Sequence, residues 1–160
     1  GFYNAGPAAG ASQRHKHLQL VPLSALPESR LPIEPLLRSV RMAGATGTVP
    51  GLPFLHAAAP LHPDWLDRRQ DGASSLLACY RSLLRAVGHA DHAASTPYNL
   101  LATRQWLLLV PRSRECFEGI SINALGFAGA LLVRNAAQLE LLRTHGPMTA
   151  LRHVALPRES

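Results

Sequence analysis

The sequence predicts an α+β protein. Apolar residues recur at helical spacing between residues 74 and 87, which favours an amphipathic helix ended by Gly88. Two apolar runs, residues 98–103 and 106–111, are separated by Arg-Gln and favour two strands of a tight hairpin. A further stretch, residues 15–21, alternates in a way that suits another strand. Helices combined with neighbouring antiparallel strands are typical of the α+β class.

The run HKHLQLV carries the most distinctive side chains of the chain. As a strand, it would present His15, His17 and Gln19 on one face. Leu18 and Leu20 would lie on the other face and could pack on a core. Because buried imidazoles and amides each need a polar partner, the first face is a poor apolar interior. We interpret this polar face as a candidate functional site.

A loop of small residues, GPAAGAS, ends two residues before this run. With small or absent side chains, its backbone N–H groups could approach an anion closely. A loop of this kind leading into histidines suits a phosphate group and a nucleophile. The pair of histidines alone is also compatible with structural histidines or with two ligands of one zinc ion.

A longer string is more specific than the histidine pair. Tyr3-Asn4, then Gly10-Ala11-Ser12-Gln13, then His15-Lys16-His17-Leu18-Gln19 resembles the active-site segment of the histidine-triad superfamily. The similarity is to the branch with Gln at the third triad position, which contains galactose-1-phosphate uridylyltransferase and the diadenosine tetraphosphate phosphorylases. The segments YNLL-T, WLLLVPRS and SINALGFAGALLV resemble the C-terminal domain of ATP adenylyltransferases, over about residues 95–156.

The resemblance implies phosphorolysis of diadenosine tetraphosphate to ATP and ADP through a covalent intermediate. His17 would attack the α-phosphorus and hold AMP until inorganic phosphate accepts it as ADP. A neutral imidazole is a competent nucleophile near pH 7, and two displacements replace one difficult step. His15 would orient or polarise, or only support His17 without touching phosphate. Gln19 would hydrogen-bond phosphate oxygens without adding a titrating group.

The same resemblance implies contacts to the nucleotide and its phosphates, and it names the expected partners. The contacts would come from Asn4, Gly10, Ala11, Ser12 and Gln13. The expected partners are dinucleoside polyphosphate, ATP, ADP and phosphate. No metal site and no covalently bound cofactor is expected, although a divalent cation such as Mg²⁺ could accompany the nucleotide. The rival functions are a histidine-triad nucleotide hydrolase and a non-catalytic nucleotide-binding remnant.

The resemblance also divides the chain into two parts. Residues 1–50 would form a partial histidine-triad-like catalytic segment and a connector, and residues 51–160 an ATP adenylyltransferase C-terminal-like domain. A boundary or long loop is expected at the Gly- and Pro-rich residues 44–53. In this branch, strands and a helix normally precede the YN segment, so we expect a fragment, a processed piece or a protein completed by another chain. An open sheet edge would then allow self-association.

The composition of the chain bears on nucleic-acid binding, membrane association and cellular compartment. The net charge of +6 comes from arginines spread along the chain with no aromatic-interleaved basic run, so nucleic-acid binding is the weaker interpretation. No run of 18 apolar residues is present, and the first residues lack a secretory signal, so no membrane association is expected. Two cysteines without a CxxC pattern fit a reduced, cytoplasmic setting.

The remaining predictions concern individual residues and short elements. Asn135 is expected to cap a helix through residue 142, and a second short helix is expected over residues 149–156. Gly126 and Gly129 should allow close backbone approach. Among single side chains, Cys79 is expected to be a core thiol, and His89 and His92 solvated loop histidines. Arg112 and Arg114 are the arginines nominated for phosphate.

Overall fold

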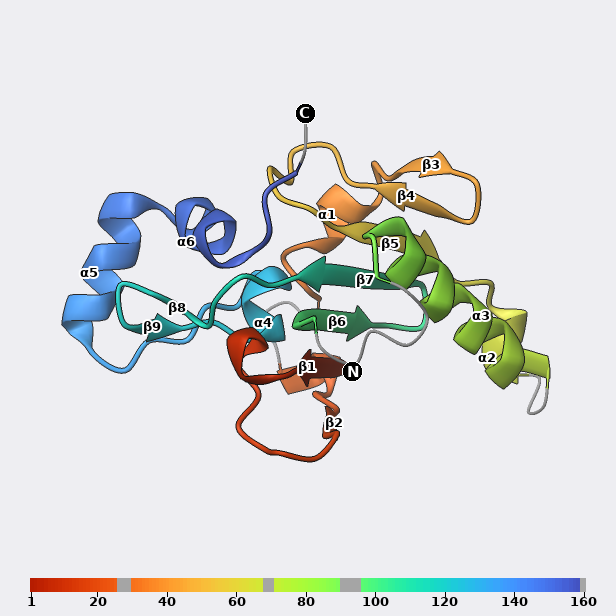
Figure 1. Cartoon of the computed structure of the whole chain (residues 1–160), viewed down its shortest axis with the longest axis horizontal. Coiled ribbons are helices and arrows are strands. Elements are labelled where there is room, and N and C mark those ends of the chain that lie inside the picture. The colour runs from red at the N-terminus through yellow and green to blue at the C-terminus, as the bar shows by residue number, and fades with distance from the viewer. Residues whose placement is uncertain (26–29, 68–70, 90–95, 159–160) are drawn as a thin grey trace.

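A seven-stranded antiparallel sheet forms the centre of the molecule, with strand order β2-β1-β6-β7-β5-β4-β3 (Figure 1). It is seen in a computed structural model that describes residues 1–25, 30–67, 71–89 and 96–158. The strands are β1 (Phe2–Ala5), β2 (Leu18–Gln19), β3 (Arg41–Ala43), β4 (Thr46–Thr48), β5 (Ala57–Pro60), β6 (Tyr98–Ala102) and β7 (Trp106–Pro111). A separate ribbon pairs β8 (Cys116–Phe117) with β9 (Ile120–Ser121).

The hairpin β6–β7 confirms the two strands predicted from the apolar runs. Its turn is closed by Thr103, whose Oγ1 accepts hydrogen bonds from the N–H groups of Gln105 (3.1 Å) and Trp106 (3.2 Å). Alternate residues of β7 enter two different hydrophobic clusters, Leu108 on one face of the sheet and Leu109 on the other. A strand buried on both faces needs apolar residues at every position, which explains the unbroken WLLLVP sequence.

Helix α3 (Asp71–Ala86) covers one face of the sheet, next to the short α2 (Asp64–Asp67) (Figure 1). The predicted helix and its terminator are confirmed, since Gly88 adopts a positive φ of 79° after the last turn. Cys79 lies in the α3 core, as expected.

The prediction for His89 is wrong. Its side chain is only 5% exposed and contacts the ring of Tyr98, with centroids 6.2 Å apart. The backbone N–H of His89 donates to Leu84 O at 2.9 Å. The chain therefore turns back at Gly88, and His89 lies against the end of the helix. A sequence of small and polar residues after a helix gives no sign of this return. His92 lies outside the described residues.

The other face is covered by short helices from both ends of the chain. They are η1 (Pro7–Ala9), α1 (Glu34–Leu37), α4 (Ala124–Phe127), α5 (Ala136–His145) and α6 (Pro147–Val154), each with at least one buried residue. The single turn η2 (Leu23–Ala25) is exposed. The cap of α5 is confirmed, because Asn135 Oδ1 accepts from Gln138 N at 2.9 Å. Helix α6 begins two residues earlier than predicted, with Pro147 in its first turn, where proline needs no N–H partner.

Two glycines allow the tight packing expected of the segment after β9. A Cβ at Gly126 would lie 2.8 Å from Ile122 Cγ2. One at Gly129 would lie 2.5 Å from Pro32 Cβ, and the φ of 98° there also disfavours other residues. Both close approaches are therefore confirmed.

Strands from both parts of the sequence belong to the same sheet. β1 and β2 pair with β6 on one side, and β3 and β4 continue the sheet beyond β5 on the other. Residues 46–48, expected in a loop, form β4, because Gly47 lets the hairpin close tightly: a Cβ there would lie 2.4 Å from Arg41 O. The predicted boundary at residue 50 therefore falls within a chain segment that contributes strands to one continuous sheet on both of its sides. The assignment of two domains stays a prediction.

Buried His56 ties the loop before β5 to the residue after β4. Its Nε2 accepts from the N–H of Val49 at 2.7 Å, and its Nδ1 lies 2.8 Å from Phe54 O. Since a carbonyl can only accept, the proton is on Nδ1 and Nε2 is bare. Burial, the larger cause, and the charge of Arg158 lower the pKa of His56, whereas its bond to Phe54 O acts in the opposite direction.

We expect His56 to make the protein less stable at acidic pH. A lowered folded-state pKa means that the unfolded chain binds the proton more tightly, so the stabilisation is complete above about pH 6.5 and is lost as pH falls below it. Urea denaturation from pH 7.5 to pH 5 should show a falling free energy of unfolding, and the His56→Gln variant should show a smaller fall. An equal fall in the two proteins would remove His56 as the cause.

Candidate functional site

The small-residue loop after β1 is wound into a compact turn. Gly6 and Gly10 have φ of 86° and 79°, and η1 lies between them. The Gly10 N–H donates to Pro7 O at 2.9 Å, and the Ala11 N–H donates to Gly6 O at 3.2 Å. In this conformation neither N–H group is left to bind an anion. Phosphate contact at Gly10 and Ala11 stays a prediction, as does contact through the exposed residues that follow, Ser12 and Gln13.

Gly10 is also the point where this turn packs on the segment before α4. A Cβ at Gly10 would lie 3.0 Å from Ile122 O and 3.2 Å from Asn123 Cα. Close contact and a positive φ together require glycine at this position. The packing fixes where the turn lies relative to β1 and α4.

Asn4 is half-buried on β1, and its amide is held in one orientation. Its Oδ1 accepts two hydrogen bonds, from Asn99 Nδ2 at 2.8 Å and from the N–H of Ala124 at 3.0 Å. Both lone-pair directions of the oxygen are thereby used, so the donor side, Nδ2, is the side presented to a ligand.

Asn99 was missed by the sequence reasoning, although it sits at the centre of this arrangement. It is 1% exposed, and its Nδ2 donates to Ala9 O at 2.9 Å as well as to Asn4. Its Oδ1 accepts from Arg112 Nη1. The available signal was the presence of an amide inside the otherwise apolar run YNLLA, because a buried amide in a strand needs specific partners.

Arg112 is not a phosphate ligand, and its nomination from the sequence is wrong. The side chain is 2% exposed and all of its donor nitrogens are engaged, with acceptors on Asn99, Ile122, Arg114, Glu115 and Val154. Burial lowers the pKa of Arg112 to about 10, so the side chain remains a cation at neutral pH. Arg114, the second nominee, is exposed and lies 3.3 Å from His153 Nε2.

The histidine segment lies mostly on a loop, and the predicted strand over residues 15–21 is wrong in extent. Only Leu18 and Gln19 form β2, whereas His15 and His17 are exposed before it. Leu18 and Leu20 are 76% and 86% exposed, so the expected core packing is also wrong. The reason is position: β2 is the edge strand of the sheet, and two residues of pairing hold it there.

The short pairing still determines which residues of this segment share a face. Gln19 lies opposite Phe2, and Leu18 lies opposite Tyr3. Since opposite residues point to the same side, half-buried Gln19 lies on the Phe2 face of the sheet, which is also the face of Asn4. The rings of His15 and His17 stand edge to face, with centroids 5.8 Å apart.

The electrostatic character of the segment is basic. Residues 1–25 contain Arg14 and Lys16, both exposed, and no Asp or Glu. Within the described ranges, no three His, Cys, Asp or Glu side chains gather in a way that could hold a metal ion. None of the described helices is long and apolar enough to cross a membrane.

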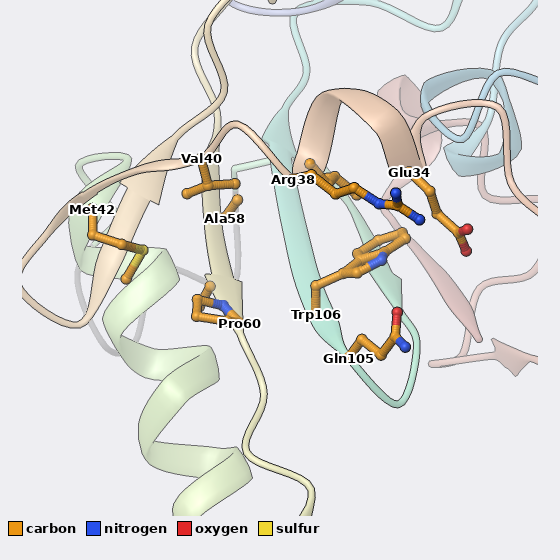
Figure 2. Close-up of a pocket in the computed structure, with 10 residues that line it drawn as sticks. Glu34, Arg38, Val40, Met42, Ala58, Pro60, Gln105 and Trp106 are labelled. Atoms are coloured by element: carbon orange, nitrogen blue, oxygen red, sulfur yellow. The ribbon is translucent and has the colours of Figure 1, made fainter.

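A pocket of about 340 Å³ opens on the same side of the sheet as α1 (Figure 2). Trp106 lies against it, with Arg38 and Glu34 from the α1 region and Gln105 from the β6–β7 turn. None of the eight residues predicted for the site lines this pocket. Of the predicted residues, Asn4 and Gln19 share one face of the sheet at β1 and β2, and Gly10 lies in the turn after β1. Ser12, Gln13, His15 and His17 are exposed on the loop between that turn and β2.

Comparison with known proteins assigns the chain to a family. Residues 50–157 match the family model of the ATP adenylyltransferase C-terminal domain, which is more than half of the chain. The chain belongs to the ATP adenylyltransferase family. Residues 1–39 of the chain match the family model of the Ap4A phosphorylase N-terminal domain. The family resemblance inferred from the sequence is thereby confirmed.

Two curated relatives come from Saccharomyces cerevisiae. The chain is 32% identical over 161 residues to diadenosine 5',5'''-P1,P4-tetraphosphate phosphorylase 2, and the match covers 88% of this chain and 46% of the relative. It is 31% identical over 150 residues to protein APA1, with 84% of this chain and 44% of the relative covered. The chain thus spans about half the length of the curated relatives it matches.

Solved structures show the same fold. The crystal structure of yeast Ap4A phosphorylase Apa2 matches with a TM-score of 0.77 and 28% identity, over 99% of this chain and 56% of that one. Apa2 in complex with Ap4A matches with a TM-score of 0.71 and 25% identity, over 99% and 55%. The predicted α+β class, with an antiparallel sheet, helices and the ATP adenylyltransferase C-terminal domain, is confirmed.

Proposed function

We propose that this adenylyltransferase chain takes part in phosphorolysis of diadenosine tetraphosphate to ATP and ADP, with His17 as the nucleophile. The observation that carries the proposal is the register between β1 and β2. It puts Gln19 on the sheet face that carries the oriented Asn4 amide, and His17 lies two residues before Gln19 on the loop that leads into β2. A nucleophile, an oriented amide donor and an uncharged amide would then meet one phosphate. A curated relative and a solved structure, both named as Ap4A phosphorylases, support the same chemistry.

The reaction proceeds in two balanced displacements. A ring nitrogen of His17 bonds to the α-phosphorus while the P–O bond to the departing ATP breaks, and the oxygen leaves with ATP. An oxygen of inorganic phosphate then bonds to the same phosphorus, which releases the imidazole and forms ADP. His15 orients the nucleophile, and Gln19 donates to phosphate oxygens, together with Asn4, Ser12 and Gln13.

The surroundings of the segment favour a polyphosphate substrate. Arg14 and Lys16 attract the anion, and the first 25 residues contain no carboxylate to repel it. Because carboxylates are the ligands that Mg²⁺ prefers in proteins, a divalent cation that arrives with the nucleotide would be carried by the phosphates. The proposed partners are therefore the dinucleotide, ATP, ADP and phosphate.

A phosphate-dependence assay tests the function and separates it from its rivals. The chain incubated with diadenosine tetraphosphate and inorganic phosphate is expected to form ATP and ADP in equal amounts, and to stop at one ATP per chain without phosphate. ATP and AMP formed in the absence of phosphate would instead identify a hydrolase. Nucleotide binding without turnover would identify a non-catalytic remnant, so either result would overturn the phosphorolysis proposal.

Two further parts of the proposal concern the setting of the protein. Self-association through the β2 edge is supported by the exposed Leu18 and Leu20 beside the short edge strand, since apolar side chains at an unpaired edge favour strand addition. A cytoplasmic location is supported by the free thiols of Cys79 and Cys116, which suit a reducing compartment.

A further inference from the structure

The environment of Arg112 is unusual for a buried cation. All five of its hydrogen-bond acceptors are neutral: the backbone carbonyls of Val154, Ile122, Arg114 and Glu115, and the side-chain oxygen of Asn99. Burying a charge is costly unless its donors are satisfied, and here they are satisfied without a carboxylate partner among these contacts. Asn99 is the one acceptor of the five that is a side chain, and it leads to the candidate site.

A donor-only side chain beside an amide determines which way the amide faces. Arginine has no acceptor, so Asn99 must turn Oδ1 toward Arg112 and Nδ2 away from it. Nδ2 then donates to Asn4 Oδ1 at 2.8 Å. That bond, together with the one from the Ala124 N–H at 3.0 Å, leaves Asn4 with Nδ2 facing outward. The orientation of Asn4 thus follows from two contacts, the Asn99 amide that Arg112 orients and the Ala124 N–H.

The same two side chains also hold the small-residue turn. The second proton of Asn99 Nδ2 goes to Ala9 O at 2.9 Å, in the last residue of η1. Arg112 Nη1 donates to Ile122 O at 2.8 Å, and Ile122 is the residue against which Gly10 packs. Arg112 therefore connects the end of β7 with both sides of the turn that precedes the histidines.

We propose that Arg112 and Asn99 are positioning residues of the nucleotide site, which orient the Asn4 amide so that it donates to the bound phosphate or ribose. The inference rests on the proposed function, because it needs a nucleotide at Asn4. It assigns no contact between Arg112 and the ligand. Arg112 orients the side-chain amide of Asn99, which in turn helps to orient the side-chain amide of Asn4.

The Asn99→Asp substitution tests the contacts that run from Arg112 through Asn99 to Asn4, here called the relay. It keeps an acceptor for Arg112 and removes the donor to Asn4. The new carboxylate also pairs with the guanidinium, which favours a folded variant. The carboxylate then faces two acceptors, Asn4 Oδ1 and Ala9 O, and repulsion between these oxygens moves the Asn4 amide out of an orientation that, of its two contacts, only the Ala124 N–H still supports. We expect the Kd for AMP, measured by titration calorimetry on the whole chain, to rise about tenfold or more, since a bond to a charged group is lost.

His56→Gln is the matched control, because it also alters a buried hydrogen-bonded side chain but lies at β5, away from the histidine segment. Its Kd for AMP is expected to be unchanged. If the Asn99→Asp variant does not fold, NMR of the side-chain NH₂ groups of the wild-type chain provides a second test. The NH₂ signal of Asn4 should shift when AMP binds.

The outcomes separate the two proposals. An Asn99→Asp chain that binds AMP as tightly as the wild type overturns the relay and leaves the proposed function standing. An Asn4 NH₂ signal that stays in place while AMP binds has the same meaning. A wild-type chain that binds no AMP overturns the proposed function and the relay with it.

Discussion

Replacing His17 by alanine is expected to abolish covalent labelling of the chain by α-phosphate-labelled diadenosine tetraphosphate. Alanine has no atom that can bond to phosphorus, and the loss of a nucleophile typically lowers turnover by a factor on the order of 10³ or more. The label should be acid-labile in the wild-type protein, as a phosphoramidate is, and absent from the variant. Mass spectrometry of the intact chain would measure the added AMP directly.

The control is an exposed histidine far from the segment. His62 lies between β5 and α2, and its side chain is 62% exposed, so His62→Ala should keep full labelling and an unchanged fold. Undiminished acid-labile label in the His17 variant would remove His17 from the reaction. Because His17 is exposed, its loss should leave the free energy of unfolding nearly unchanged, which separates a chemical effect from a structural one.

Arg112→Leu is expected to have the largest effect on stability. The substitution leaves the carbonyls of Ile122 and Val154, the Asn99 amide and two further acceptors without their donors in a buried region. Each unsatisfied buried group costs about 1–3 kcal/mol, and the loss is partly relieved by relaxation and by the apolar replacement. We expect a fall of roughly 3–5 kcal/mol in the free energy of unfolding, measured by urea denaturation.

Arg114→Leu provides the comparison within the same segment. Arg114 is exposed, and its side chain contacts His153 at the surface, so its replacement should change the free energy of unfolding by about 0.5 kcal/mol or less. Equal effects at the two positions would show that the hydrogen bonds of Arg112 contribute no more than a surface contact. Such a result would also weaken its role in orienting Asn99.

Elements with strong local periodicity could be predicted from the sequence. Helix α3 presents one apolar stripe to the sheet, and the spacing of that stripe is visible in the sequence. Strand β7 is apolar at every position because both of its faces are covered, and its length of 6 residues is typical of a strand. The Asn135 cap was equally local, since a side chain and an N–H three residues later make the whole interaction.

Features that depend on distant partners could not be predicted in this way. The His15–Val21 alternation suggested a full strand, but its extent was decided by how far β1 could pair with it, which is two residues. The role of Arg112 depends on Val154, Ile122 and Asn99, which are 42, 10 and 13 positions away. Local sequence contains no information on such pairs, so a buried structural arginine resembled a phosphate ligand.

The pairing of β1 with β6 has a consequence for how the protein folds. Asn4 and Asn99 are 95 positions apart, whereas β6 and β7 are joined by a tight turn. Closing a chain of that length costs conformational entropy before any contact between the two strands forms, and proteins dominated by such distant contacts fold slowly. Strand β1 and the residues around Asn4 therefore acquire their geometry only when nearly the whole chain is in place. Ligand binding at the site would then measure folding of the whole chain. Ligand affinity and native structure would be lost together in one cooperative unfolding transition.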